Sequence, residues 1–130
     1  MWTYTTPAVR FESDENVIEE RCYTINVGIC KYSGGGMQIV PHADFQSGQL
    51  AYTVVKSFPK WRVIFDSPKL FSGKLKTHPY ALMGTGKQIR AQSMDNESLI
   101  GEVDGEFIGK GPFTYGCMKS AIRVVVPKTK

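Results

Sequence analysis

The chain has 130 residues, of which 42% are hydrophobic and 22% charged, a balance typical of one globular domain with its own core. No run approaches the ~18 apolar residues that a membrane-spanning helix needs, and the amino terminus lacks the basic start and apolar stretch of a signal peptide. We therefore expect a single cytoplasmic domain of residues 1–130. The cysteines at 22, 30 and 117 show no C-x-x-C spacing, which favours reduced, buried thiols.

Short segments rich in β-branched and aromatic residues, separated by glycine and proline, predict a mostly β domain. Within the second of them Tyr23, Ile25, Val27 and Ile29 alternate with smaller or polar residues, which predicts one half-buried face. In chain order, the predicted extended segments are residues 8–13, 20–30, 37–40, 50–56, 87–93, the two runs around Asp104-Gly105, and 121–126.

The segment "SFPKWRVIFDSPKLFSGK" is the one stretch that departs from the strand period and predicts a helix. Ser57 is a plausible amino-terminal cap, and Trp61, Ile64 and Phe65 share one helical face. We expect Ser67-Pro68 to divide the segment into two short helical pieces. The fold class predicted is a two-layer β-sandwich with a short helical insertion at about residues 58–72.

Basic charge is concentrated in residues 56–76, which hold six lysines and arginines against one aspartate. The surplus there is six minus one, or +5, whereas the rest of the chain carries ten minus eleven, or −1. Aromatic and aliphatic residues lie between these charges, as in segments that rest on anionic membranes. Two other interpretations are a nucleic-acid surface and an amphipathic helix whose apolar face packs on the sandwich.

Other familiar motifs are incomplete. Gly86-Lys87 lacks the glycine and the hydroxyl residue of a phosphate-binding P-loop, and Gly109 and Gly111 lack the third glycine of a dinucleotide fingerprint. The histidines and cysteines share no metal-ligand spacing, so no metal site is predicted. Residues Gly34, Gly35 and Gly36 favour a tight turn over a ligand-binding loop.

The dipeptide Asp104-Gly105 between two strands predicts a type I′ hairpin turn, because both central residues of that turn need positive φ. The next residue, Glu106, is held by strand pairing, and its carboxylate therefore has a defined direction. Such placement suits a general base. By residue chemistry alone, a plain hairpin turn is the favoured interpretation.

The order of "VGICKYSGGGMQIVPHA", "SGQLAYTVV", a helical insertion, "KTHPY", "VDGE" and "AIRVVVP" resembles the carboxy-terminal β-sandwich domain of diacylglycerol kinase-like lipid kinases, sphingosine kinases among them. The resemblance implies that Glu106 is the catalytic base for a lipid hydroxyl, positioned by Asp104 and Gly105. It also implies that ATP and Mg²⁺ serve the complete kinase through a separate amino-terminal α/β domain, absent here. This chain alone is then expected to bind neither and to be inactive.

The partners that the resemblance implies are a lipid substrate, the missing ATP-binding domain and the inner face of an anionic membrane, without nucleic acid. Candidate membrane-facing residues are Lys60, Trp61, Arg62, Phe65 and Lys69. The sequence departs from the family at Ser47 and Ala51, where relatives carry acids of a structural magnesium site. These departures support an alternative, a non-catalytic kinase half that keeps the fold and lipid contact.

Overall fold

The computed structural model describes residues 6–128, apart from the side chains of Val63, Ser67, Lys69, Leu70 and Phe71. It is mostly β, as predicted, with a six-stranded antiparallel sheet, a two-stranded hairpin and one α-helix. The sheet order is β4-β3-β2-β1-β5-β8. The strands are β1 (Ala8–Glu12), β2 (Val17–Gly28), β3 (Leu50–Lys56), β4 (Ala81–Gly86), β5 (Gln88–Ser93), β6 (Ile100–Val103), β7 (Glu106–Lys110) and β8 (Phe113–Gly116).

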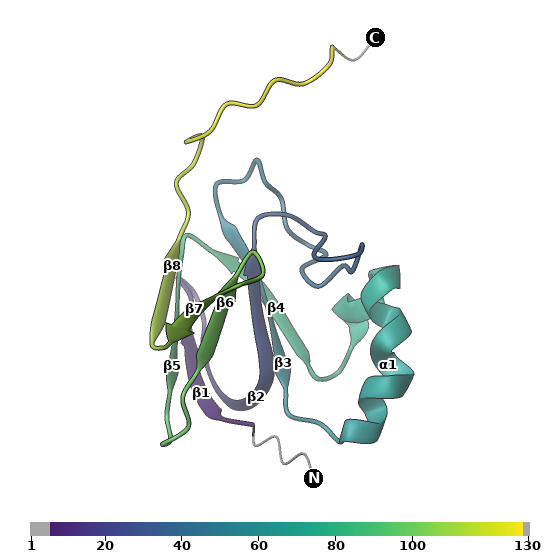
Figure 1. Ribbon diagram of the computed structural model, residues 1–130, viewed down its shortest axis with the longest axis vertical. Coiled ribbons are helices and arrows are strands. Elements are labelled where there is room, and N and C mark those ends of the chain that lie inside the picture. The colour runs from purple at the N-terminus through teal and green to yellow at the C-terminus, as the bar shows by residue number, and fades with distance from the viewer. Residues whose placement is uncertain (1–5, 129–130) are drawn as a thin grey trace.

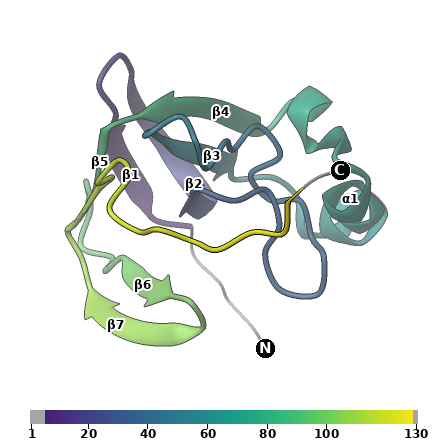
Figure 2. The same ribbon diagram turned by 90° about the horizontal axis from the view of Figure 1, so that it is seen from above.

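The β6 and β7 hairpin forms the second, smaller layer, and it crosses in front of the main sheet in Figure 1. Figure 2 shows the long loop of residues 29–49 between the hairpin and helix α1. Helix α1 (Lys60–Ser72) and the short 3₁₀ helix η1 (Lys74–Thr77) lie at the opposite end of the domain from the hairpin in both views. The two candidate functional elements are therefore well separated.

The hydrophobic core lies under the centre of the sheet and follows the alternation of the sequence. Val9 and Phe11 of β1 and Ile89 of β5 are fully buried, as the period of two predicts. Tyr52 of β3 packs its ring against that of Phe11, with centroids 4.5 Å apart. Strand β3 is buried on both faces from Leu50 to Val54, because the 29–49 loop covers the face turned away from this core.

Strand β2 departs from the predicted alternation. Its pairing with β3 shifts between Cys22 and Thr24, which marks a β-bulge at Tyr23. A bulge reverses the face on which later side chains lie, so Cys22 enters the core together with Ile25 and Val27 while Tyr23 is exposed. The inward position predicted for Tyr23 is therefore wrong.

Helix α1 is continuous, which corrects two details of the sequence analysis. It begins after Pro59 without a side-chain cap, so Ser57 is not the capping residue, and it continues through Pro68. Gly73, with φ of 69°, ends it in a left-handed conformation. The hydrogen bond lost at Pro68 does not break the helix, and Asp66, two residues before it, is bonded to His78 just after η1.

The strand predicted at residues 121–126 is absent. From residue 121 to 128 the chain is extended but lies outside every strand, and it runs away from the domain in Figure 1. Ile122, Val124, Val125 and Val126 are each at least 73% exposed. β-branched composition favours extended backbone, but a strand also needs a neighbour, and no described segment pairs with this one.

Candidate functional site

The hairpin turn at Asp104 and Gly105 has the predicted geometry. Their φ angles are 50° and 84°, so both central residues have positive φ, and the type I′ prediction is confirmed. Glu106 is the first residue of β7 and pairs with Val103 across the turn. The backbone position of this glutamate is therefore fixed by the strand ladder.

The Glu106 carboxylate is exposed and makes no hydrogen bond or ion pair with the other described residues. A carboxylate in this situation is free to accept a proton from a group that approaches from outside the domain. No second titratable side chain of the described structure contacts it. The hairpin thus presents the Glu106 carboxylate without neighbouring groups among the described residues that would complete a catalytic site.

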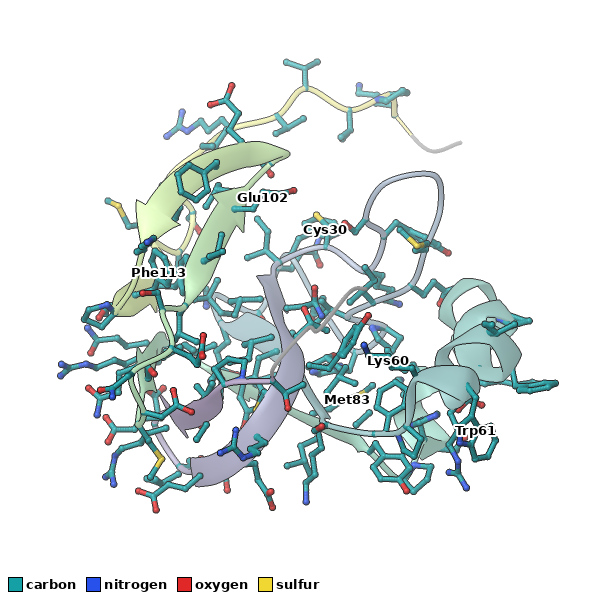
Figure 3. The ribbon with its side chains drawn as sticks, turned by 60° about the horizontal axis from the view of Figure 1, so that its bottom comes forward. Cys30, Lys60, Trp61, Met83, Glu102 and Phe113 are labelled. Carbon is teal, nitrogen blue, oxygen red and sulfur yellow. The ribbon has the colours of Figure 1, made fainter. Side chains whose placement is uncertain are left out.

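The hairpin is attached to the main sheet by close packing at Gly101. This residue is buried, and a methyl group added there would overlap the ring of Phe113 in β8. The backbone N–H of Gly111 also donates a hydrogen bond to the Leu99 carbonyl oxygen, 2.8 Å away. Figure 3 shows Phe113 beside the base of the hairpin and Glu102 farther along it.

The three glycines form a tight exposed turn, as the sequence favoured. Ser33 and Met37 exchange two backbone hydrogen bonds of 2.8 and 3.1 Å, and Gly34, Gly35 and Gly36 between them all have positive φ. A single bridge rather than the predicted strand therefore follows at residue 37. These glycines do not adjoin Glu106.

Helix α1 exposes the face that an ordinary amphipathic helix would bury. Trp61, Ile64 and Phe65 are 60%, 76% and 74% exposed, so the alternative interpretation, in which this apolar face packs on the sandwich, is wrong. The Arg62 guanidinium lies over the rings of both Trp61 and Tyr80, 5.3 and 5.4 Å from their centroids. Lys60 is exposed, and the side chain of Lys69 lies outside the described part of the structure.

A histidine that sequence analysis did not assign to the site anchors this helix. His78 is buried, and its Nε2 donates a hydrogen bond to Asp66 Oδ2 of α1, 2.8 Å away. The rings of Phe58 and Tyr80 pack beside His78. Because one face of α1 is held in this way, the apolar face turns outward. Only the folded structure reveals the pairing of His78 with Asp66, since 12 residues separate them in the chain.

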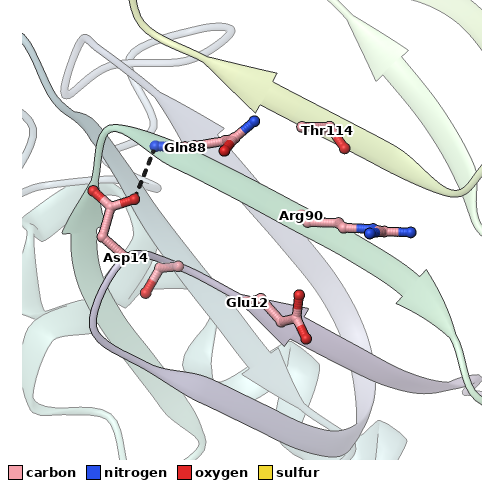
Figure 4. Close-up of a pocket in the computed structure, with 6 residues that line it drawn as sticks. Glu12, Asp14, Gln88, Arg90 and Thr114 are labelled. Carbon is pink, nitrogen blue, oxygen red and sulfur yellow. Dashed lines mark hydrogen bonds between the residues drawn. The ribbon is translucent and has the colours of Figure 1, made fainter.

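A polar hollow lies over β1, β5 and β8 and is shown in Figure 4. Its carboxylates have structural partners: Asp14 accepts the backbone N–H groups of Lys87 and Gln88, and Glu12 accepts from Arg10. Arg90 and Thr114 complete the lining. Because Asp14 ties two turns together, the hollow contributes to fold rather than to chemistry.

The residues do not fit the magnesium site that the resemblance implies. Ala51 is buried in β3, and Ser47 Oγ donates a hydrogen bond to the Asp44 carbonyl oxygen, 2.8 Å away. Within residues 6–128, no three His, Cys, Asp or Glu side chains gather closely enough to hold a metal ion. No helix in this range is long and apolar enough to cross a membrane.

Residues 1–126 match the family described as the YegS C-terminal NAD kinase beta sandwich-like domain. Diacylglycerol kinases of two strains of Staphylococcus epidermidis are 24% identical over 120 residues, which are 92% of this chain and 37% of each relative. Two solved structures described as diacylglycerol kinases of Bacillus anthracis have the same fold. One gives a TM-score of 0.69 at 24% identity, covering 89% of this chain and 38% of that chain. The other gives 0.69 at 23%, covering 92% and 40%.

The chain belongs to the YegS C-terminal NAD kinase β-sandwich-like domain family. It spans well under half of the length of the relatives it matches. The match to this family confirms the resemblance to kinase carboxy-terminal domains that the sequence motifs indicated.

Proposed function

We propose that this chain is the lipid-facing, carboxy-terminal domain of an ATP-dependent lipid kinase, in which Glu106 accepts the proton of the attacking lipid hydroxyl. The acceptor is diacylglycerol or a similar lipid. ATP and Mg²⁺ bind to the part of the kinase that this chain does not cover. The family and the names of the relatives support the kinase class.

The observation that carries the proposal is the position of Glu106. Phosphoryl transfer needs the nucleophile in line with the γ-phosphate, metal ions to neutralise charge, and a group that takes the hydroxyl proton. A carboxylate fixed at a rigid turn, without partners among the described residues, suits the last of these roles. The first two require groups that the described residues do not gather.

The exposed face of α1 supports contact with a membrane. Trp61, Ile64 and Phe65 present apolar surface, and the helix and η1 add lysines and an arginine around it. Apolar side chains of this kind insert at the interface, while the basic residues attract anionic head groups. A kinase held there by α1 reaches lipid substrates that never leave the bilayer, so the domain acts at the cytoplasmic membrane surface.

The experiment is Glu106→Gln in the complete kinase, with Glu102→Gln as the matched control. Glutamine keeps the shape of the side chain but is no base, so turnover of Glu106→Gln should fall by roughly 10²-fold or more with lipid KM little changed. Glu102 is exposed on the other strand of the same hairpin, and its variant should keep full turnover. A fully active Glu106→Gln enzyme would contradict the proposed role.

A second candidate function is a non-catalytic lipid-binding domain derived from such a kinase. Ser47 and Ala51, which replace the acids of the implied magnesium site, favour it. The two functions differ in one measurement, the phosphorylation of lipid by the complete protein with Ser47 and Ala51 unchanged. A complete protein that phosphorylates lipid excludes the second candidate.

A further inference from the structure

The loop of residues 29–49 borders a cavity of about 700 Å³ that is open to solvent and that no motif in the sequence indicated. Its walls are the start of the loop, residues 29–32, its later part, residues 41–45, and Lys76 of η1. The volume lies within the range of pockets that bind small molecules. The cavity lies next to η1, which follows the basic helix α1 in the chain. Glu106, by contrast, lies on the separate hairpin and does not line the cavity.

The floor of the cavity is rigid. Val40 and Ala43 of the loop are buried against Ala51 of β3, and Thr53 Oγ1 donates a hydrogen bond to the Ile39 carbonyl oxygen, 2.8 Å away. His42 Nε2 similarly donates to the Gly84 carbonyl oxygen in β4 at 2.8 Å. The loop is thus fastened to two neighbouring strands, and the cavity is part of the folded domain.

The rim of the cavity is apolar and aromatic. Tyr32 and Phe45, which line it, are 63% and 72% exposed, and Ile29 beside them is largely exposed as well. Exposed aromatic side chains gathered around one hollow mark a binding surface, because isolated proteins rarely leave such groups together in water. The occupant of this cavity is therefore expected to bring apolar surface.

Charge at the cavity selects an anion. Lys31 and Lys76 line it, and neither forms an ion pair or hydrogen bond with another described residue. The one acidic side chain in the lining, Asp44, accepts the backbone N–H of Gln46 at 2.9 Å. Lys76 belongs to η1, which packs against α1, so this lysine continues the basic surface of that helix.

One further group on the lining is unsatisfied. Because His42 Nε2 donates to Gly84, Nδ1 is the ring nitrogen left to accept a hydrogen bond, and this buried atom has no partner among the described residues. Buried polar atoms of folded proteins nearly always have a hydrogen-bond partner. An occupant of the cavity, or a water molecule that it holds, can supply the missing donor.

We propose that this cavity binds one anionic phospholipid, with an acyl chain against Ile29, Tyr32 and Phe45 and the phosphate between Lys31 and Lys76. The inference deepens the proposed function and rests on it, because it assumes that the domain faces a membrane. It adds the class of lipid and a defined pocket on the domain. The helix α1 would lie on the same bilayer and bring the cavity to its surface.

The test is an NMR titration of the 130-residue chain with a short-chain phosphatidylglycerol below its micelle concentration. Short-chain phosphatidylcholine is the probe without net charge. Inorganic phosphate is the probe without acyl chains. We expect saturable shifts of residues 29–32, 41–45 and 76 with the anionic lipid only. In a parallel measurement, bound lipid should slow alkylation of Cys30, an exposed thiol on the lining.

The double variant Lys31→Gln/Lys76→Gln should bind the lipid at least roughly tenfold more weakly, the scale expected for two lysines beside an anionic head group. The control Lys87→Gln/Lys110→Gln removes the same charge at exposed positions outside the cavity and should bind like the parent chain. Equal weakening by both pairs, equal affinity for the neutral lipid, or binding of inorganic phosphate alone would each overturn the proposal.

The lipid titration uses neither ATP nor turnover, so its result is independent of the catalytic test. Glu106→Gln should leave the lipid affinity unchanged, because Glu106 does not line the cavity. A complete kinase that loses turnover on Glu106→Gln while its isolated domain binds no anionic lipid would keep the proposed function and reject this inference.

Discussion

At the scale of single residues, the direction of the Glu106 side chain follows from backbone geometry rather than from side-chain contacts. Asp104 and Gly105 both occupy the left-handed region, and the ladder resumes at Val103 and Glu106. Strain at this turn would therefore be transmitted directly to the proposed base. The same logic applies at Gly101, where the ring of Phe113 leaves no room for a side chain.

Gly105→Ala should destabilise the domain by about 1 kcal/mol, because a Cβ is unfavourable at a φ of 84° even though the space around it is open. Thermal denaturation followed by circular dichroism measures the change. Asp104→Asn is the control, since asparagine tolerates positive φ, and its melting temperature should be nearly unchanged. An equally stable Gly105→Ala variant would show that the turn adopts another conformation in solution.

The cysteines should differ sharply in reactivity. Burial raises the pKa of the Cys22 thiol to about 11, so at pH 8 this group stays protonated as well as shielded. Cys30 is exposed, which corrects the expectation of buried thiols. Alkylation with iodoacetamide, read by peptide mass spectrometry, should modify Cys30 rapidly and Cys22 only on unfolding. Rapid labelling of Cys22 in the folded chain would contradict its place in the core.

At the scale of elements, helix α1 is held by one face and presents the other. The hydrogen bond from His78 to Asp66 fixes its inner side, and the aromatic contacts of Phe58 and Tyr80 surround that anchor. The exposed apolar side chains consequently contribute little to folding. The proposed function assigns these side chains to membrane contact.

Phe65→Ser should weaken binding of the chain to phosphatidylglycerol vesicles, while the free energy of unfolding changes by no more than about 0.5 kcal/mol, as for other exposed positions. Vesicle sedimentation and chemical denaturation measure the two quantities. Met94→Ser, at an exposed apolar position just after β5, is the matched control and should bind normally. Equal loss in both variants would mean that α1 is not the membrane contact.

At the scale of the whole molecule, the domain carries one proposed catalytic group and no phosphate-binding loop of recognised type. The relatives are more than twice as long as the matched part, which covers 37% to 40% of them. The proposed division of labour follows: lipid contact and proton acceptance belong to this chain, and nucleotide binding to the remainder of a kinase. The hairpin and the extended segment 121–126 also expose large apolar side chains.

Calorimetric titration of this chain with ATP and Mg²⁺ should show no saturable heat. The physical reason is that the sequence completes neither a phosphate-binding P-loop nor a dinucleotide fingerprint, the two glycine-rich motifs that present backbone N–H groups to phosphates. The complete kinase, titrated in the same way, is the positive control. A micromolar dissociation constant for the isolated chain would contradict the two-domain assignment.

The sequence by itself determined the elements with strong local signals. Alternation located β1, β3 and β5, the Asp-Gly pair specified the turn type, and helical periodicity placed α1 within two residues of its predicted start. Each of these depends on neighbours in the chain, which is why local reasoning succeeds. The order of motifs also identified the family, because their combination is far more specific than any one of them.

Only the tertiary structure decided which surfaces are left without partners. The bulge at Tyr23 changed the inward face of β2, the short strands β4 and β8 formed by pairing rather than by their own pattern, and residues 121–126 found no neighbour. The contact of His78 with Asp66 and the cavity beneath the 29–49 loop likewise join distant residues. These outcomes depend on long-range packing, which local propensity does not encode.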